Sequence, residues 1–243
     1  MPAKKQILIG AHRGAMVYEP ENTLAAFEKA IEQGAYRIEF DVRRTRDGHL
    51  VLMHDATADR TTDGAGEIAR MTLAEVRRLR AGGTRPVPTF AEALACLKGR
   101  AKALPEIKQA GIAAQLVGEI RAAGMVADCT ISSFLEDELG RCRQLCPELP
   151  IAYFLTEPKP FSAAEIVERL GATLLIVWPQ AIRSEYLADA HAHGMHIRCG
   201  FNDRMPFEEA EALFHRFADM GVDEVSCGRP DWIARMIARN AAD

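Results

Sequence analysis

Short β-rich segments alternate with amphipathic helical segments along almost the whole chain. The predicted strands cover residues 6–11, 36–43, 102–107, 129–133, 151–154, 174–178, 196–199 and 224–227. A helix is predicted after each strand, over residues 22–33, 90–97, 112–123, 136–145, 163–170, 184–193, 207–220 and 232–239. Helical crossovers make consecutive strands parallel, and eight such units close into a TIM (β/α)8 barrel. An open doubly wound sheet is the alternative, although no Gly-x-Gly-x-x-Gly follows the first strand.

One long segment interrupts this alternation after the second predicted strand. Asp47-Gly48 predicts a tight turn, and residues 49–53 predict a returning hairpin strand. The following residues up to Pro88 are polar, so an insertion of about forty residues replaces a loop of two to six. Loops that follow strands lie on the catalytic face of a barrel. We therefore expect one barrel domain over residues 1–243, with an inserted hairpin or lid segment at about 45–88 over the active site.

Composition excludes several classes of protein. The net charge of −4 over 243 residues argues against a nucleic-acid-binding protein, which would show a basic stripe. No segment approaches the roughly 20 apolar residues of a membrane span. Residues 1–6 lead directly into the first predicted strand and leave no room for a signal peptide, so a cytoplasmic protein is expected. The oligomeric state is not predicted.

Three acidic residues lie near the ends of two predicted strands. Glu39 and Asp41 are two positions apart, so their side chains leave the same face of the second strand, and Glu106 lies at the end of the third. The ends of barrel strands converge on one rim, where three carboxylates would repel one another. Mg²⁺ or Ca²⁺ would remove this repulsion and keep positions open for water and phosphate oxygens. The sequence therefore predicts one divalent cation as cofactor.

Two histidines and two basic residues are predicted on the same rim. His12 and Arg13 follow the first strand, His54 closes the hairpin, and Lys108 follows the third strand. Imidazole exchanges protons near neutral pH, and a guanidinium group binds phosphate through paired hydrogen bonds. Together with a cation, these groups predict metal-assisted chemistry on a phosphorylated substrate.

These residues belong to an ordered set of short motifs. In chain order the set is His12-Arg13-Gly14, Pro20-Glu21-Asn22-Thr23, Glu39-x-Asp41, Asp47-Gly48, His54-Asp55, Arg60-Thr61-Thr62-Asp63-Gly64, Val87-Pro88-Thr89, Glu106-Ile107-Lys108 and Ser132-Ser133-Phe134. The set resembles the pattern of the glycerophosphodiester phosphodiesterase family, in the same order and over much of the chain. The resemblance implies a TIM barrel with an inserted lid segment.

The resemblance also implies roles for individual residues. It implies a divalent cation held by Glu39, Asp41 and Glu106, with His12 and His54 as the acid–base pair. Which histidine is the base remains open. In the implied reaction, the glycerol's own hydroxyl attacks the phosphate, and water then opens the cyclic phosphate. The implied products of this small-molecule glycerophosphodiester are glycerol 3-phosphate and a free alcohol.

Further residues are implied to contact the substrate. Arg13 and Lys108 would contact the phosphate, and Glu21 and Asn22 would line the site.

The motifs depart from the family at the last two strands. After the seventh strand a Trp-x-x-Asn run is replaced by Cys199-Gly200-Phe201-Asn202, and after the eighth a Thr-Asp-x-Pro run is replaced by Cys227-Gly228-Arg229-Pro230. Trp178, at the end of the sixth strand, is the predicted replacement for the lost aromatic wall.

Two other functions fit the same residues. One is a lysophospholipase D-type enzyme that uses the same site, although the sequence shows no Lys- and Arg-rich amphipathic anchor. The other is a barrel that binds a phosphorylated ligand without turnover, which only the altered last two motifs favour.

A separate cluster, His191, His193 and His196, resembles a zinc site. No cysteine or acidic residue has suitable spacing beside it, so we expect no metal there.

Overall fold

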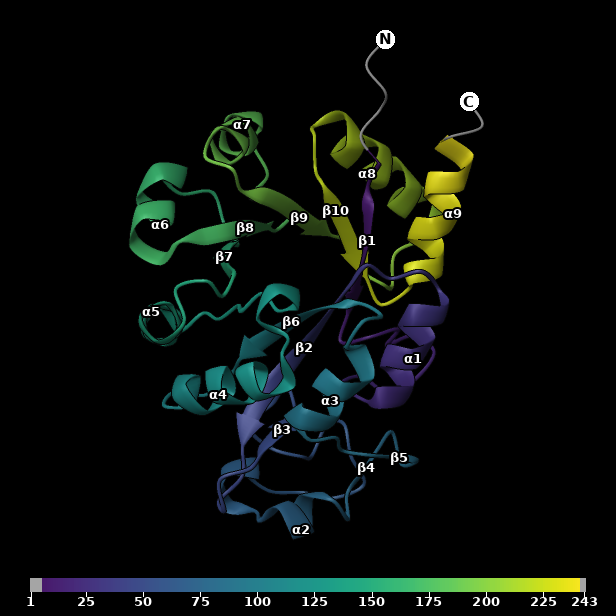
Figure 1. The fold of residues 1–243 in the computed structure, drawn as a ribbon. Helices are drawn as coiled ribbons and strands as arrows, with labels where there is room; N and C mark the ends of the chain where they lie inside the picture. The colour runs from purple at the N-terminus through teal and green to yellow at the C-terminus, as the bar shows by residue number, and fades with distance from the viewer. Residues whose placement is uncertain (1–5, 241–243) are drawn as a thin grey trace.

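The computed structural model describes residues 6–240. Figure 1 shows the parallel strands at the centre of the molecule and most of the helices around them. The elements in chain order are β1 (Leu8–His12), α1 (Leu24–Glu32), β2 (Arg37–Arg44), β3 (Leu50–Leu52), η1 (Ile68–Arg70), α2 (Leu73–Val76), β4 (Arg80–Ala81), β5 (Arg85–Pro86), α3 (Phe90–Leu97), β6 (Lys102–Ile107), α4 (Ala113–Ala123), η2 (Val126–Asp128), α5 (Glu136–Leu145), β7 (Ile151–Leu155), α6 (Ala163–Leu170), β8 (Ala172–Val177), α7 (Ser184–Ala192), β9 (His196–Gly200), α8 (Phe207–Asp219), β10 (Glu224–Cys227) and α9 (Pro230–Asn240).

The parallel strands close into a barrel. β1 pairs with β2 on one side and with β10 on the other, and the sheet continues through β9 and β8 to β7. β6 pairs with the free side of β2. Residues 129–133 lie between β6 and β7 and are hydrogen-bonded to both, since the Ser132 N–H donates to the Pro105 oxygen and the Ala152 N–H donates to the Ile131 oxygen. The predicted TIM barrel is confirmed, and the open sheet is excluded.

The fourth predicted strand differs from its neighbours. Residues 129–133 form isolated bridges to β6 and β7 and no continuous strand. The Thr130 N–H donates to the Ala103 oxygen at 2.9 Å, and the Ser132 N–H donates to the Pro105 oxygen at 3.0 Å. Pro105 has no N–H with which to donate the bond between these two, so the ladder is interrupted there.

The first helix begins two residues later than predicted. Thr23 is its N-cap, and the Thr23 hydroxyl accepts a hydrogen bond from the Ala26 N–H at 3.2 Å. Asn22 was predicted as the first helical residue, but its φ of 58° lies in the left-handed region. Asparagine is one of the few residues that adopt this conformation readily. This turn directs the Asn22 side chain toward Asp41 on β2.

The barrel interior has an apolar part and a charged part. Side chains from β6, β7 and β8 form an apolar cluster inside it, made of Leu104, Ala152, Leu174 and Ile176. Charged side chains come from Glu39 and Asp41 on β2, Glu106 on β6, Arg198 on β9 and Glu224 on β10. A larger apolar core separates the barrel from its surrounding helices. The fold itself therefore separates the apolar side chains of the barrel interior from the charged ones.

The insertion, residues 45–88, forms a small unit with its own core. β3 returns antiparallel to β2, which confirms the predicted hairpin. β3, α2, β4 and β5 lie together beyond the end of the β2 arrow (Figure 1). The buried residues of this unit are Val51, Met53, Ala58, Ile68, Val76 and Val87. Apolar packing of this kind stabilises a long connection that would otherwise be flexible.

No helix within residues 6–240 is both long enough and apolar enough to cross a bilayer. The segment on which the signal-peptide expectation rests, residues 1–6, lies almost wholly outside the described residues.

Candidate active site

A cavity of about 710 Å³ lies at the C-terminal ends of the barrel strands. Seven of the predicted site residues line it: His12, Arg13, Glu39, His54, Glu106, Lys108 and Trp178. They come from five different segments, and the barrel brings them together as predicted. Asp41, Glu21 and Asn22 are not among the lining residues. Glu21 and Asp41 each contact Arg13, which lines the cavity, and Asn22 is hydrogen-bonded to Asp41.

The three predicted metal ligands form one group, called here the carboxylate cluster. One oxygen from each of Glu39, Asp41 and Glu106 lies within 4.8 Å of the others, and no other group of this kind occurs within residues 6–240. The parallel register pairs Asp41 with Glu106 across β2 and β6, which explains their proximity. The exposed fractions of the three residues are 6%, 0% and 8%, so water solvates them poorly.

The electrostatics of the carboxylate cluster favour a bound cation. Burial, with the charges of Asp41 and Glu106, raises the pKa of Glu39 well above its ordinary value. Burial and the Asp41 charge likewise raise the pKa of Glu106. The buried Oδ1 of Asp41 has no hydrogen-bond partner. An all-carboxylate set with an unpartnered oxygen fits a hard divalent cation such as Mg²⁺ or Ca²⁺.

Two basic side chains lie against the same carboxylates. The Lys108 ammonium donates to Glu106 Oε1 at 2.7 Å and lies 3.7 Å from Asp41 Oδ1. Arg13 Nε lies 3.3 Å from Asp41 Oδ2, and the main-chain N–H of Arg13 donates to Glu39 Oε2 at 3.0 Å. These contacts balance part of the negative charge and hold both basic groups at the cavity wall.

The imidazole of His12 lies beside the carboxylate cluster. Its Nε2 is 3.8 Å from Glu39 Oε2, and 42% of its side chain remains accessible. Removal of water by the surrounding barrel, together with the positive charges of Arg13 and Arg198, lowers the pKa of His12 below its ordinary value. The imidazole is therefore neutral at pH 7 and can accept a proton.

The imidazole of His54 is oriented by its chain neighbour. His54 Nδ1 lies 2.6 Å from Asp55 Oδ1. Arg43 on β2 donates to the His54 main-chain oxygen from Nη2 at 2.8 Å. Because Nδ1 is hydrogen-bonded to Asp55, Nε2 is the ring nitrogen that remains available for proton transfer in the cavity. The arrangement suits a proton donor or acceptor.

Aromatic side chains form another part of the cavity wall. Phe134 and Phe154 stack almost parallel with ring centroids 4.3 Å apart, and the exposed fraction of Phe134 is 53%. Trp178 follows β8 at this wall with an exposed fraction of 45%. Large apolar groups left exposed inside a cavity are typical of a ligand-binding surface.

The sequence interpretation missed two contributors. Arg198 lines the cavity although it is only 2% exposed, pairs with Glu224, and donates to the Ala11 oxygen at 3.0 Å. Its position between buried Ile197 and Cys199 could have indicated an inward-facing charge. The second is Asp55, for which the sequence predicted no role beyond membership of a motif. Its position next to His54 in the chain could have indicated that it orients the imidazole.

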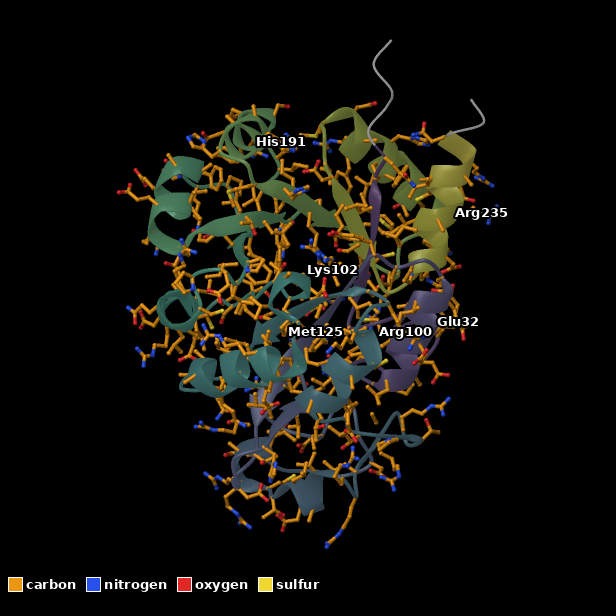
Figure 2. All side chains as sticks on the ribbon, viewed as in Figure 1. Glu32, Arg100, Lys102, Met125, His191 and Arg235 are labelled. Carbon is orange, nitrogen blue, oxygen red and sulfur yellow. The ribbon has the colours of Figure 1, made fainter. Side chains whose placement is uncertain are left out.

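The histidines near residue 191 form no metal site. His191 Nε2 lies 2.9 Å from Asp223 Oδ2, so its partner is an acid distant in sequence. His191 lies on α7, far from the insertion that supplies His54 (Figure 2). Within residues 6–240 these histidines belong to no group with metal-binding geometry.

Comparisons with known proteins agree on one family. A sequence profile described as the glycerophosphoryl diester phosphodiesterase family matches residues 12–232. A glycerophosphodiester phosphodiesterase of Caldanaerobacter subterraneus subsp. tengcongensis is 39% identical over 158 residues, which is 59% of this chain and 65% of that protein. A second protein of the same name, from Bacillus subtilis, is 29% identical across 93% of this chain and 85% of its own length.

Solved structures with a similar fold are also phosphodiesterases. A glycerophosphodiester phosphodiesterase from Agrobacterium tumefaciens superimposes with a TM-score of 0.83 at 31% identity, covering 94% of this chain and 99% of the other. An Oleispira antarctica phosphodiesterase in complex with the product sn-glycerol-3-phosphate has a TM-score of 0.83 at 27% identity, covering 96% of this chain and 97% of the other.

Proposed function

The chain belongs to the glycerophosphoryl diester phosphodiesterase family, whose members are phosphoric diester hydrolases, and on this premise we propose that it hydrolyses glycerophosphodiesters. The proposed products are glycerol 3-phosphate and an alcohol. The product named for the Oleispira antarctica phosphodiesterase, sn-glycerol-3-phosphate, supports this choice of substrate. The barrel and the insertion act as one catalytic unit, and the insertion borders the cavity through His54.

One observation carries the proposal. Three buried carboxylates lie within 4.8 Å of one another, and two of them, Glu39 and Glu106, line a cavity together with two histidines and two basic residues. A divalent cation held by Glu39, Asp41 and Glu106 would draw charge from the phosphate oxygens and lower the barrier to attack at phosphorus. Mg²⁺ and Ca²⁺ both suit these oxygen ligands.

The basic side chains bind the phosphate. Arg13 and Lys108 lie at the cavity wall within 4 Å of the carboxylate cluster, so a phosphate next to that cluster would lie within their reach. Glu21 accepts a hydrogen bond from Arg13 Nη1 at 2.9 Å and so orients the guanidinium group from behind. Charge-assisted hydrogen bonds of this kind are about twice as strong as neutral ones.

The two histidines transfer protons. One imidazole takes the proton of the glycerol hydroxyl as its oxygen forms a bond to phosphorus. The other gives a proton to the alcohol whose bond to phosphorus breaks. In the second step their roles are exchanged, because water gives up a proton as it opens the cyclic phosphate and the glycerol oxygen takes one back. Each imidazole returns to its initial state.

A second candidate function rests on the aromatic wall. Phe134, Phe154 and Trp178 give the cavity an apolar side on which the leaving alcohol would lie. Leu135 beside them is also exposed, at 39%. This surface would equally accept the acyl-bearing part of a lysophospholipid. A lysophospholipase D-type activity on the same site is therefore the alternative.

Turnover of defined diesters tests the proposal. Glycerophosphocholine, glycerophosphoethanolamine and lysophosphatidylcholine are assayed with Mg²⁺, with Ca²⁺ and with a chelator. Release of glycerol 3-phosphate from the first two, abolished by the chelator, is the expected result. Turnover of lysophosphatidylcholine alone would favour the alternative. Tight binding of all three without turnover under either cation would indicate a non-catalytic phosphate-binding barrel.

A further inference from the structure

We propose that Arg60, on the insertion, is a positioning residue that fixes the acid–base group His54 and the phosphate-binding group Arg13 at the same time. The inference rests on the function proposed above and deepens it. Arg60 does not line the cavity. It acts through two carboxylates, each of which holds one of the two active groups.

The first carboxylate is Asp55. Arg60 Nε donates to Asp55 Oδ2 at 2.6 Å, and Arg60 Nη2 donates to Asp55 Oδ1 at 3.1 Å. The same Oδ1 lies 2.6 Å from His54 Nδ1. The paired hydrogen bonds fix the plane of the carboxylate, and the carboxylate in turn fixes the imidazole ring.

The second carboxylate is Glu21. Arg60 Nη1 donates to Glu21 Oε2 at 3.0 Å, and Arg60 Nη2 donates to Glu21 Oε1 at 2.9 Å. Arg13 Nη1 donates to the same Oε1 at 2.9 Å. One guanidinium group therefore connects the loop after β1 with the insertion, and through them Arg13 with His54.

The charges along this chain of contacts support one another. Hydrogen bonding from Arg60, followed by that from His54, keeps the pKa of Asp55 below its ordinary value. Burial opposes ionisation of Glu21, but the bonds from Arg60 and Arg13 together leave its pKa lowered. Both carboxylates are thus ionised at pH 7 and accept all the hydrogen bonds described. Lysine could not replace Arg60, because a single ammonium group cannot make two paired contacts.

The insertion offers a matched control. Arg85 also joins the insertion to the loop after β1, since its Nε and Nη2 donate to Glu19 at 3.0 and 2.9 Å. The accessible fractions of the Arg85 and Arg60 side chains are similar, 46% and 49%. Glu19 is bonded to neither Arg13 nor His54 in any contact described. Loss of Arg85 removes a similar tether and leaves the two active groups untouched.

The first measurement is steady-state kinetics of Arg60→Ala and Arg85→Ala. A displacement of about 1 Å at reacting groups can lower turnover about 10²-fold, and we expect a loss of that order for Arg60→Ala. We expect Arg85→Ala to remain within about twofold of wild type, since its only paired contact lies away from the reacting groups. Added guanidinium ion, at concentrations too low to denature, should restore part of the activity of Arg60→Ala. It should not do so in Arg60→Ala/Asp55→Ala.

The second measurement does not depend on turnover. Nitrogen-15 NMR of the imidazoles, with His54 assigned by comparison with His54→Gln, reports which ring nitrogen carries the proton. Wild type and Arg85→Ala should show one tautomer with the proton on Nδ1, and Arg60→Ala should show a mixture. An unchanged His54 tautomer in Arg60→Ala, or equal kinetic losses in the two alanine variants, would overturn the inference. If wild type has no diesterase activity, the proposed function fails while the tautomer result still decides the role of Arg60.

Discussion

Asn22 and Asp41 are joined by two reciprocal hydrogen bonds. Asn22 Nδ2 donates to Asp41 Oδ2 at 2.8 Å, and the Asp41 N–H donates to Asn22 Oδ1 at 3.0 Å. The amide therefore holds one oxygen of Asp41 and leaves Oδ1 without a hydrogen-bond partner. The left-handed backbone at Asn22, with φ of 58°, makes this contact possible. Asn22, implied by the motifs to line the site, acts in this structure by orienting a carboxylate.

Replacement of Asn22 should weaken metal binding. Loss of the partner that orients a metal ligand typically costs about 10–100-fold in metal affinity. We expect a reduction in this range for Asn22→Gly, measured by calorimetric titration with Ca²⁺. Glycine keeps the left-handed backbone without strain, so the change isolates the amide. Asn22→Ala adds backbone strain and should also lower the melting temperature. Unchanged affinity in Asn22→Gly would show that the amide does not support the site.

The carboxylate cluster should contribute less stability to the metal-free protein as pH rises. The pKa values of Glu39 and Glu106 are raised in the fold, first by burial and then by neighbouring carboxylates. Between the unfolded value of about 4.3 and the raised folded value, the folded state holds more protons than the unfolded state. The contribution of these two residues to the free energy of unfolding therefore decreases with increasing pH in that window, whereas His12, whose pKa is lowered in the fold, contributes in the opposite sense below about pH 6.5.

Melting temperatures recorded with a chelator between pH 5 and pH 8 measure this effect. Between pH 5 and pH 8, Glu39→Gln should lose less stability than wild type, because one of the repelling carboxylates is gone. Added Ca²⁺ should raise the melting temperature more at pH 8 than at pH 5, since binding requires ionised ligands. Parallel profiles for wild type and Glu39→Gln would contradict the assigned electrostatics.

Removal of either proposed acid–base histidine should lower turnover and leave the fold intact. Positioned proton transfer contributes roughly 10²–10⁴-fold to rate, so we expect losses in that range for His12→Ala and for His54→Ala. His49→Ala is the control, because His49 is exposed and lies in the same hairpin as His54. Circular dichroism and melting temperature should match wild type in all three.

A change of leaving group then distinguishes the two histidines. A glycerol diester of 4-nitrophenol releases a phenolate that needs no proton. The variant that lacks the general acid of the first step should regain release of 4-nitrophenolate, and the variant that lacks the general base of that step should not. Wild-type rates for either alanine variant on glycerophosphocholine would refute its role.

Trp178 should contribute to binding of the leaving alcohol. Its half-exposed ring lies at the apolar wall, and loss of such a contact surface costs about 1–2 kcal/mol. For Trp178→Ala we expect KM to rise about tenfold with kcat nearly unchanged, because a uniform binding contact is lost. Trp232→Phe leaves Trp178 as the only one of the chain's 2 tryptophans, so its fluorescence should change on titration with substrate. Wild-type KM in Trp178→Ala would refute the contact.

The barrel and the convergence of the site were predictable because they follow from local patterns. Alternation of strands and helices predicts parallel strands, and parallel strands place Glu39, Asp41 and Glu106 on one rim. The interruption at residues 129–133 depends on Pro105 in the neighbouring strand, so the local sequence of 129–133 carried no sign of it. Tertiary pairing decided that element.

The supporting contacts were less predictable. Arg60 reaches Glu21 across 39 residues of sequence, and Arg198 reaches the Ala11 oxygen across 187. Such contacts depend on how the insertion and the last strands pack against the first loop. The sequence motifs include Glu21, Asp55 and Arg60 but not Arg198. Only the three-dimensional arrangement shows which side chain holds which.

The most direct test of the account is the position of a bound cation. Crystals grown with Mn²⁺, an oxygen-preferring substitute for Mg²⁺, are measured by anomalous diffraction. The account predicts one strong peak in contact with oxygens of Glu39, Asp41 and Glu106, lost in crystals of Glu39→Gln/Glu106→Gln. A fully ordered cavity with no peak at saturating Mn²⁺, or a peak bound by other residues, would contradict it.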